Sequence, residues 1–191
     1  MIVLCLKELW LECQNCNKCP LSKTRKNVVF GGGNLRSKIM FIGEGPGKEE
    51  DIQGRPFVGK AGQLLNKMLE AIGLNREDVY IANIVKCRPP NNRPPLQNEI
   101  EACIPYLRNQ VAIIRPKIIV CLGATAAKAI IDKDFKITAM RGQWTERKGV
   151  KIIATYHPAA LLRDPEKKKP AWEDFKEIKA QLDKLEDKNE G

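Results

Sequence analysis

Short apolar runs alternate along the chain with longer stretches in which apolar residues recur every three or four positions. The runs predict buried strands at 28–33, 39–42, 80–85, 118–122 and 151–155. The spaced stretches predict amphipathic helices at 1–12, 60–72, 97–114, 125–131 and 172–185. Strands that alternate with helices are typical of an α/β protein. We therefore expect a three-layer α/β/α fold with a mainly parallel central sheet.

The length of 191 residues suits one domain over 1–191 with a full core. Within it the first segment, 1–12, is the N-terminal helix, and the charged segment 183–191 is expected to fray. No apolar run reaches the roughly 20 residues that a membrane helix needs. The apolar segment at the start of the sequence is too short for a signal peptide and lacks the basic residues that begin one. The sequence thus predicts a cytoplasmic protein without a membrane partner.

The charge is strongly positive and unevenly spread. The net charge is +10, and between residues 13 and 43 there are cations but no acid. These cations are Lys18, Lys23, Arg25, Lys26, Arg36 and Lys38. A second acid-free stretch, between residues 79 and 98, contains Lys86, Arg88 and Arg93. Segregated positive charge favours a polyanionic partner, and nucleic acid is the first candidate.

Seven cysteines in a cytosolic chain indicate a metal site or catalysis rather than disulfides. Cys13, Cys16 and Cys19 form two overlapping C-x2-C pairs, and Cys87 and Cys103 are the distant candidates for the remaining ligands. Four thiolates can hold zinc or an iron–sulfur cluster. One close pair with two widely separated ligands favours a cubane cluster. Cys5 and Cys121 stand among apolar residues and are predicted to lie in the core.

Candidate chemistry gathers where predicted strands end. The glycine-rich segment 43–47 follows the strand 39–42, and Phe57 lies in a second glycine-flanked loop. Asn83 is a polar residue within an apolar strand, and His157, the single histidine, directly follows the strand 151–155. Ligands of parallel sheets bind beyond the carboxyl ends of the strands. These segments are therefore expected to form one pocket.

The chain resembles the family 4 uracil-DNA glycosylases, the iron–sulfur branch of that superfamily. The resemblance rests on residues 43–47, 50–51, 54–59, 83–90, 92–93, 141–142 and 157–163. It implies that the enzyme flips deoxyuridine out of DNA and hydrolyses its N-glycosidic bond, the first step of base-excision repair. It also implies a 4Fe–4S cluster held by Cys16, Cys19, Cys87 and Cys103, with Cys13 as an extra cysteine.

The resemblance assigns roles to the pocket residues. Phe57 stacks on the flipped uracil, Asn83 pairs with its O4 and N3–H, and the backbone of Gly43, Glu44 and Gly45 holds O2. His157, best as a neutral imidazole, donates to the charge that develops on O2.

Contacts with DNA are implied for a second set of residues. Leu161 or Leu162 wedges into the gap left in the duplex. Arg163 binds phosphate, and Arg88 and Arg93 belong to the DNA-facing surface. The partner is uracil-containing DNA, double or single stranded, and the chain is expected to be a monomer.

The group that orients the attacking water is open. Relatives of this superfamily carry Asp or Asn where this chain has Gly45, so Glu44 is the first candidate and Glu50 the second. Glu50 has an alternative role: it can crowd C5 of the base and exclude thymine, since Gly47 stands where relatives use an aromatic residue. The alternative function is an iron–sulfur nucleic-acid-binding or redox module without hydrolase activity.

Overall fold

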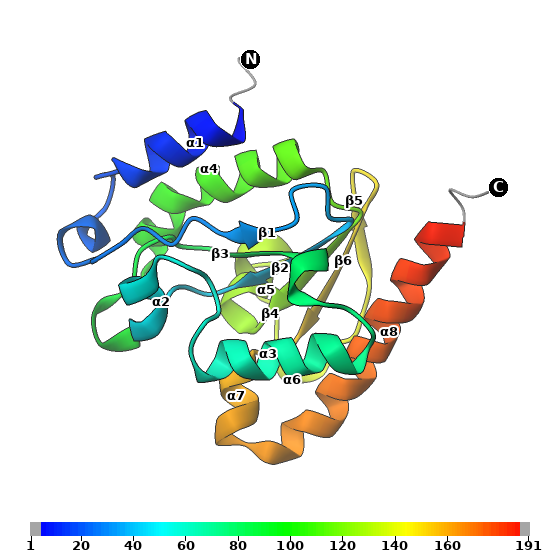
Figure 1. The fold of residues 1–191 in the computed structure, drawn as a ribbon. Helices are drawn as coiled ribbons and strands as arrows, with labels where there is room; N and C mark the ends of the chain where they lie inside the picture. Colours follow the sequence, from blue (N-terminus) through cyan, green and yellow to red (C-terminus); the bar gives the residue numbers. More distant parts are fainter. Residues whose placement is uncertain (1–4, 188–191) are drawn as a thin grey trace.

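The computed structural model describes residues 5–187 and contains a six-stranded sheet in the order β1-β3-β2-β4-β6-β5 (Figure 1). The strands are β1 (Gly32–Gly33), β2 (Ile39–Gly43), β3 (Tyr80–Asn83), β4 (Ile118–Leu122), β5 (Thr145–Arg147) and β6 (Val150–Thr155). The four inner strands are parallel to one another, and the edge strands β1 and β5 are antiparallel to their neighbours.

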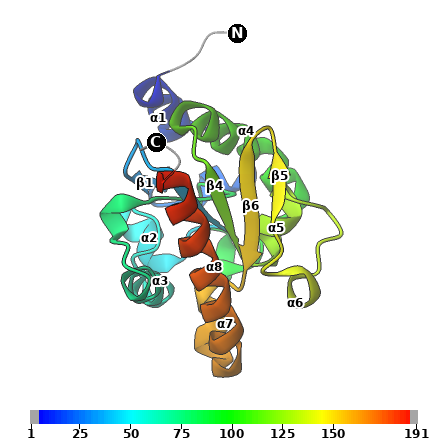
Figure 2. The ribbon, with the colours of Figure 1, turned by 90° about the vertical axis from the view of Figure 1, so that its right-hand side faces the viewer.

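Helices cover both faces of the sheet. One face carries α1 (Leu6–Gln14), α4 (Gln97–Ile114) and α5 (Ala124–Ile130), and the other carries α3 (Lys60–Ala71) and α8 (Lys168–Asp187) (Figures 1 and 2). Strand β2 shows the alternation that separates the two cores: Met40 and Ile42 pack with α4, whereas Ile39 and Phe41 pack with α3 and α8. The predicted three-layer α/β/α fold is confirmed.

Several element boundaries differ from those predicted. Strand β3 ends at Asn83, and beyond it the amides of Ile84 and Val85 donate to the carbonyls of Gly43 and Glu44, at 2.9 and 3.2 Å. The strand predicted at 28–33 is reduced to β1. Strand β5 was missed because its residues are all exposed and give no apolar pattern. Helix α8 continues to Asp187, and residues 1–4 of the predicted N-terminal helix lie outside the described part.

Two short helices, α2 (Lys48–Gln53) and α7 (Pro158–Arg163), follow the carboxyl ends of β2 and β6. A third, α6 (Ile137–Met140), lies between α5 and β5. Strands β2, β3, β4 and β6 all point their carboxyl ends to the same edge of the sheet. No helix in the described residues has the length and apolar character needed to cross a membrane.

Candidate active site

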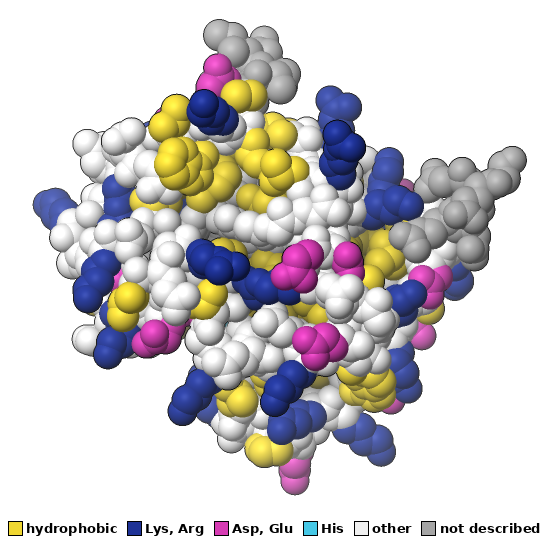
Figure 3. All heavy atoms as spheres, viewed as in Figure 1, with side chains coloured by type: hydrophobic (Ala, Val, Ile, Leu, Met, Phe, Trp, Pro, Cys, Tyr) yellow, Lys and Arg dark blue, Asp and Glu magenta, His cyan; other side chains and the backbone are white. Residues whose placement is uncertain are grey.

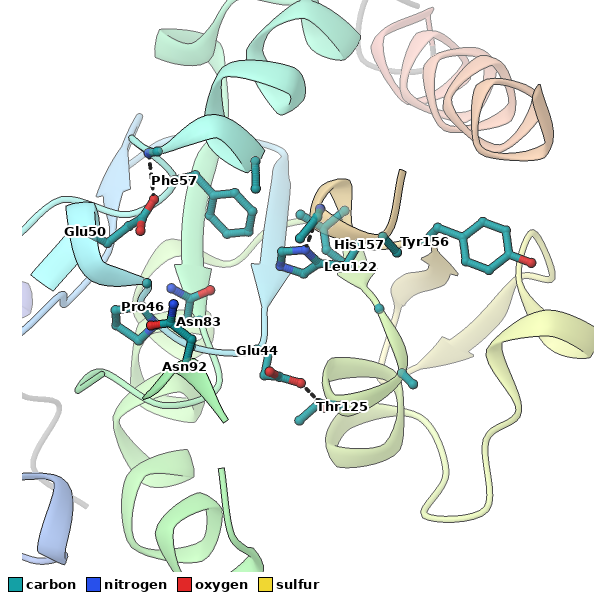
Figure 4. A pocket seen from close by; sticks show the side chains of 18 of the residues that line it. Glu44, Pro46, Glu50, Phe57, Asn83, Asn92, Leu122, Thr125, Tyr156 and His157 are labelled. Carbon is teal, nitrogen blue, oxygen red and sulfur yellow. Dashed lines mark hydrogen bonds between the residues drawn. The ribbon is translucent and has the colours of Figure 1, made fainter. Parts of the chain in front are cut away.

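A cleft of about 600 Å³ lies at the carboxyl edge of the four parallel strands. Its wall includes Asn83 at the end of β3, and Glu44, Gly123 and His157 from the segments that follow β2, β4 and β6. Phe57 enters from the loop after α2. Figure 4 shows the side chains of Phe57, Asn83 and His157 around one space. The convergence predicted from the strand ends is therefore present.

Gly43 allows two of these side chains to meet. A Cβ at Gly43 would lie 2.5 Å from Asn83 Oδ1 and 2.6 Å from Phe57 Cζ, closer than such atoms can approach. Asn83 itself is 1% exposed, and its Oδ1 accepts no hydrogen bond from the described residues. A buried amide oxygen without a donor is costly unless a ligand supplies one. The Asn83 side chain is thus prepared for a donor that enters the cleft.

The Phe57 loop is held in an unusual conformation by Arg76. Phe57 has a φ of 52°, in the left-handed region that a bulky residue rarely adopts. The Arg76 guanidinium donates to Phe57 O at 2.9 Å and also to Pro56 O. Gly62 lies so close that a Cβ there would be 1.9 Å from Phe57 O. Sequence reasoning missed Arg76, because nothing in its local pattern links it to a loop nineteen residues earlier.

The surroundings of His157 determine which of its ring nitrogens carries a proton. Its Nδ1 accepts a hydrogen bond from the backbone amide of Ala159 at 3.1 Å. In a neutral imidazole the proton therefore resides on Nε2. Burial, and to a smaller extent the positive charge of Arg163, lowers the pKa of His157 to about 4, although Glu50 opposes the shift. The ring is accordingly a neutral donor at physiological pH.

The two candidate glutamates are engaged differently. Glu44 turns toward α5, where its carboxylate accepts a hydrogen bond from the Thr125 hydroxyl (Figure 4). Glu50 Oε1 accepts from the amides of Val58 and Gly59, at 2.9 and 2.8 Å. A Cβ at Gly47 would lie 2.8 Å from Glu50 Oε2. The Glu50 carboxylate thus occupies the space that a side chain at position 47 would take, and it also braces the Phe57 loop.

Contacts with α8 fix the end of β6, which precedes His157. Asp174 of α8 is buried, accepts from the Thr155 hydroxyl at 2.6 Å and forms an ion pair with Arg141. A Cβ at Gly142 would lie 2.6 Å from Asp174 Oδ1. The Arg141-Gly142 pair singled out in the sequence therefore acts at a distance from the cleft, by anchoring β6.

The candidate DNA-contacting residues divide into available and engaged groups. Leu162 is 46% exposed on α7, whereas Leu161 is 1% exposed and packed in the interior. The wedge prediction for Leu161 is wrong for this reason, and it stays with Leu162. Arg163, also on α7, is exposed.

The two arginines predicted to face DNA from the loop after β3 are less available. Both terminal nitrogens of Arg93 donate hydrogen bonds to the Glu99 carboxylate, at 2.9 and 2.7 Å, so the positive charge of Arg93 is already paired. Arg88 donates to Asn92 Oδ1 at 2.7 Å and is half-buried. On the face shown in Figure 3, Lys and Arg side chains are spread among fewer acidic ones, in keeping with the net charge of +10.

Five cysteines line one small cavity between α1, the loop after β3 and α4. They are Cys13, Cys16, Cys19, Cys87 and Cys103. This cavity is called the cysteine cradle below. The four predicted ligands are all in it, and so is Cys13, which is buried. Cys121 is buried in the core as predicted, but Cys5 is exposed at the start of α1, so its predicted place in the core is wrong.

Two of the cysteine sulfurs in the cradle accept hydrogen bonds. Arg25 Nη1 donates to Cys87 Sγ, and the amide of Lys86 donates to Cys103 Sγ, both at 3.2 Å. Burial raises the pKa of Cys103 to about 11, while the Lys86 charge lowers it. Within the described chain, no three candidate side chains converge as the ligands of a single ion would. A cubane cluster does not need such convergence, because each thiolate binds a different iron atom.

Comparison with known proteins identifies the class. A family model described as the uracil DNA glycosylase superfamily matches residues 30–176. The type-4 uracil-DNA glycosylase of Archaeoglobus fulgidus is 49% identical over 181 residues, which is 91% of each chain. That of Thermotoga maritima is 53% identical over 155 residues, covering 79% of this chain and 80% of the relative. A type-5 uracil-DNA glycosylase of Pyrobaculum aerophilum is 34% identical over 180 residues, covering 77% and 79%.

The chain belongs to the uracil-DNA glycosylase superfamily, and within it to the type-4 family. The resemblance noted in the sequence is therefore confirmed. These relatives give no support to the alternative of a redox module without hydrolase activity.

Proposed function

We propose that this protein removes uracil from DNA: it flips deoxyuridine into the cleft, hydrolyses the N-glycosidic bond and releases uracil, leaving an abasic site. The observation that carries the proposal is Asn83 Oδ1, a buried acceptor without a donor beside Phe57 and His157. A pyrimidine with a protonated N3 supplies the missing donor.

Recognition of the base follows from the chemistry of these groups. The Asn83 side-chain oxygen accepts from N3–H, and its NH2 group donates to O4. The ring of Phe57 provides the face on which the base stacks. The backbone of Gly43, Glu44 and Gly45 borders O2. The Glu50 carboxylate, which fills the space beside Gly47, crowds C5 and disfavours thymine.

Bond cleavage builds negative charge on the leaving base. As the bond between C1′ and N1 breaks, its electron pair moves onto uracil, and His157 Nε2–H donates to the charge that collects on O2. The water oxygen forms the new bond to C1′, and its proton is released. Glu44, held by Thr125, is the first candidate to orient this water, and Glu50 is the second.

We further propose a 4Fe–4S cluster with Cys16, Cys19, Cys87 and Cys103 as ligands. The donor set fits this group, as do the cations that line the cradle, Lys18, Arg25 and Lys86. When bound, the cluster supplies a covalent cross-link between the end of α1, the loop after β3 and α4. The chain's own residues carry out recognition and hydrolysis.

The partner is DNA, in which Leu162 fills the gap left by the flipped base and Arg163 binds phosphate. Both double- and single-stranded DNA are proposed as substrates. Arg88 and Arg93 are proposed to border the same surface. A monomeric single domain in the cytoplasm completes the proposal.

Release of free base from a labelled oligonucleotide tests the function. The oligonucleotide carries one uracil, and matched strands carry thymine or cytosine at that position. We expect one uracil and one abasic site per strand, and no release from the matched strands. A protein that binds the strand with its cluster intact yet releases no uracil would overturn the proposal and favour the redox module.

A further inference from the structure

We propose that Lys86 is a positioning residue that connects the cysteine cradle to Asn83 and fixes the strand end that presents the uracil-reading amide. This inference rests on the proposed role of Asn83. Lys86 lines the cradle and has no part in the recognition or hydrolysis described above.

Lys86 is buried to a degree that lysine rarely reaches. It is 1% exposed, and its Nζ donates to Asn83 O at 2.9 Å and to Gln110 Oε1 at 2.6 Å. Among the described residues it forms no ion pair with a carboxylate. Burying an ammonium group is costly unless hydrogen bonds and opposite charge compensate it. Two neutral oxygens compensate this cost only in part, so we expect Lys86 to have a specific role.

The acceptors of Lys86 belong to a connected network. Gln110 of α4 donates in turn to Phe30 O at 2.9 Å and to the Tyr80 hydroxyl at 3.0 Å. Tyr80 begins β3, and Asn83 ends it. Lys86 and Gln110 therefore brace both ends of the strand that carries the reading amide.

The segment 83–87 spans the distance between the two sites. The Asn83 side chain lines the cleft, and the amides of Ile84 and Val85 bond to Gly43 O and Glu44 O. Lys86 folds back onto the carbonyl of Asn83, and its own amide donates to Cys103 Sγ. Cys87 then enters the cradle. Five consecutive residues thus join the cluster ligands to the recognition amide.

The reach of the side chain explains why the connecting residue is a lysine. From position 86 its Nζ bonds both to Asn83 O at 2.9 Å and to Gln110 Oε1 at 2.6 Å, on a different element. These hydrogen bonds fix the backbone of Asn83. Without the Nζ donor, the backbone carbonyl of Asn83 loses this hydrogen bond. The side-chain amide of Asn83, which is proposed to read uracil, should then be held less firmly.

The test compares Lys86→Met, Lys86→Arg and the surface control Lys128→Met, with Asn83→Asp measured in parallel. The readouts are the Kd of free uracil, the Kd of thymine-containing DNA, the single-turnover rate and the iron content. For Lys86→Met we expect uracil binding to weaken about tenfold, with DNA binding and iron unchanged within about twofold. Lys86→Arg, which keeps donors, should recover part of the affinity, and Lys128→Met should match the unmodified protein.

Each outcome decides the inference. Unchanged uracil affinity in Lys86→Met overturns it, as does a loss matched by equal losses of iron and DNA binding, which would assign Lys86 to folding alone. If Lys86→Met does not fold, Gln110→Met decides, because it removes the second anchor of Nζ: weaker uracil binding supports the inference and unchanged binding overturns it. If Asn83→Asp binds uracil normally, the proposed role of Asn83 fails, and this inference fails with it.

Discussion

The ring of Phe57 stacks against the imidazole of His157, with centroids 5.5 Å apart and planes inclined by 28°. The loop after α2 and the end of β6 therefore meet across the cleft. The stacking and the hydrogen bond from Ala159 together fix the imidazole, so that Nε2–H is the edge left for a ligand. One contact thus joins the stacking ring to the donor for the leaving base.

Replacing His157 with Ala should reduce the single-turnover cleavage rate by about 10²–10³, because a donor to charge that develops in the transition state is lost. Binding of uracil-containing DNA should weaken much less. Rapid-quench cleavage and DNA titration measure the two quantities separately. A rate loss below about threefold would show that His157 only packs against Phe57.

The free energy of unfolding should depend on pH as expected for a histidine that is neutral in the folded protein. Its pKa of about 4 lies below the ordinary value of 6.5, so the ring stays neutral across physiological pH. Between these two values the unfolded chain binds a proton at this position that the folded chain does not, and stability falls as the pH is lowered from 6.5 towards 4. Denaturation in urea at several pH values should show this loss, and His157→Ala should reduce it. A stability loss of equal size in both proteins would contradict the pKa.

Arg76→Met should loosen the Phe57 loop, because the backbone oxygens of Phe57 and Pro56 lose their charged donor and a strained φ loses its support. We expect weaker uracil binding and a loss of roughly 1–3 kcal/mol in the free energy of unfolding. Calorimetry and urea denaturation measure these changes. The matched control is Arg55→Met, an exposed neighbour. Equal behaviour of the two variants would remove the role given to Arg76.

The cysteine cradle offers a matched pair of its own. Cys87→Ala should lose the cluster, its brown colour and much of the stability, because the loop after β3 is no longer cross-linked to α1 and α4. Cys13→Ala, which changes a buried cradle cysteine outside the predicted ligand set, should keep its iron. Metal analysis and thermal denaturation give the answer. Two results would contradict the assignment. One is zinc at one per chain in the unmodified protein, and the other is loss of iron from Cys13→Ala but not from Cys87→Ala.

The apolar pattern sufficed for the fold because buried parallel strands are continuous apolar runs. Strand β4 is one such run, and it is entirely buried. Strand β5 could not be found in this way, since all its residues face solvent and its place depends on pairing with β6. Asn83 and His157 could be predicted because each breaks a local pattern: an amide in an apolar strand and a lone histidine at a strand end.

Residues that act through long-range contacts gave no such signal. Thr125, Arg76 and Lys86 look ordinary in the sequence, and only the folded chain brings them to Glu44, Phe57 and Asn83. Leu161 and Leu162 show the same limit, because the helical phase that buries one and exposes the other is set by how α7 docks.

The most direct test of the account is base selection by Asn83→Asp. The substitution replaces the donor to O4 with a second acceptor, while cytosine offers an amino group at the same place. We predict that uracil excision from single-stranded DNA falls about 10²-fold or more, since uracil O4 and the carboxylate oxygen that faces it are both left without a donor, at roughly 1–3 kcal/mol each. Weak excision of unpaired cytosine is the expected gain. Uracil excision at the unmodified rate would show that Asn83 does not read the base, and would contradict the central claim.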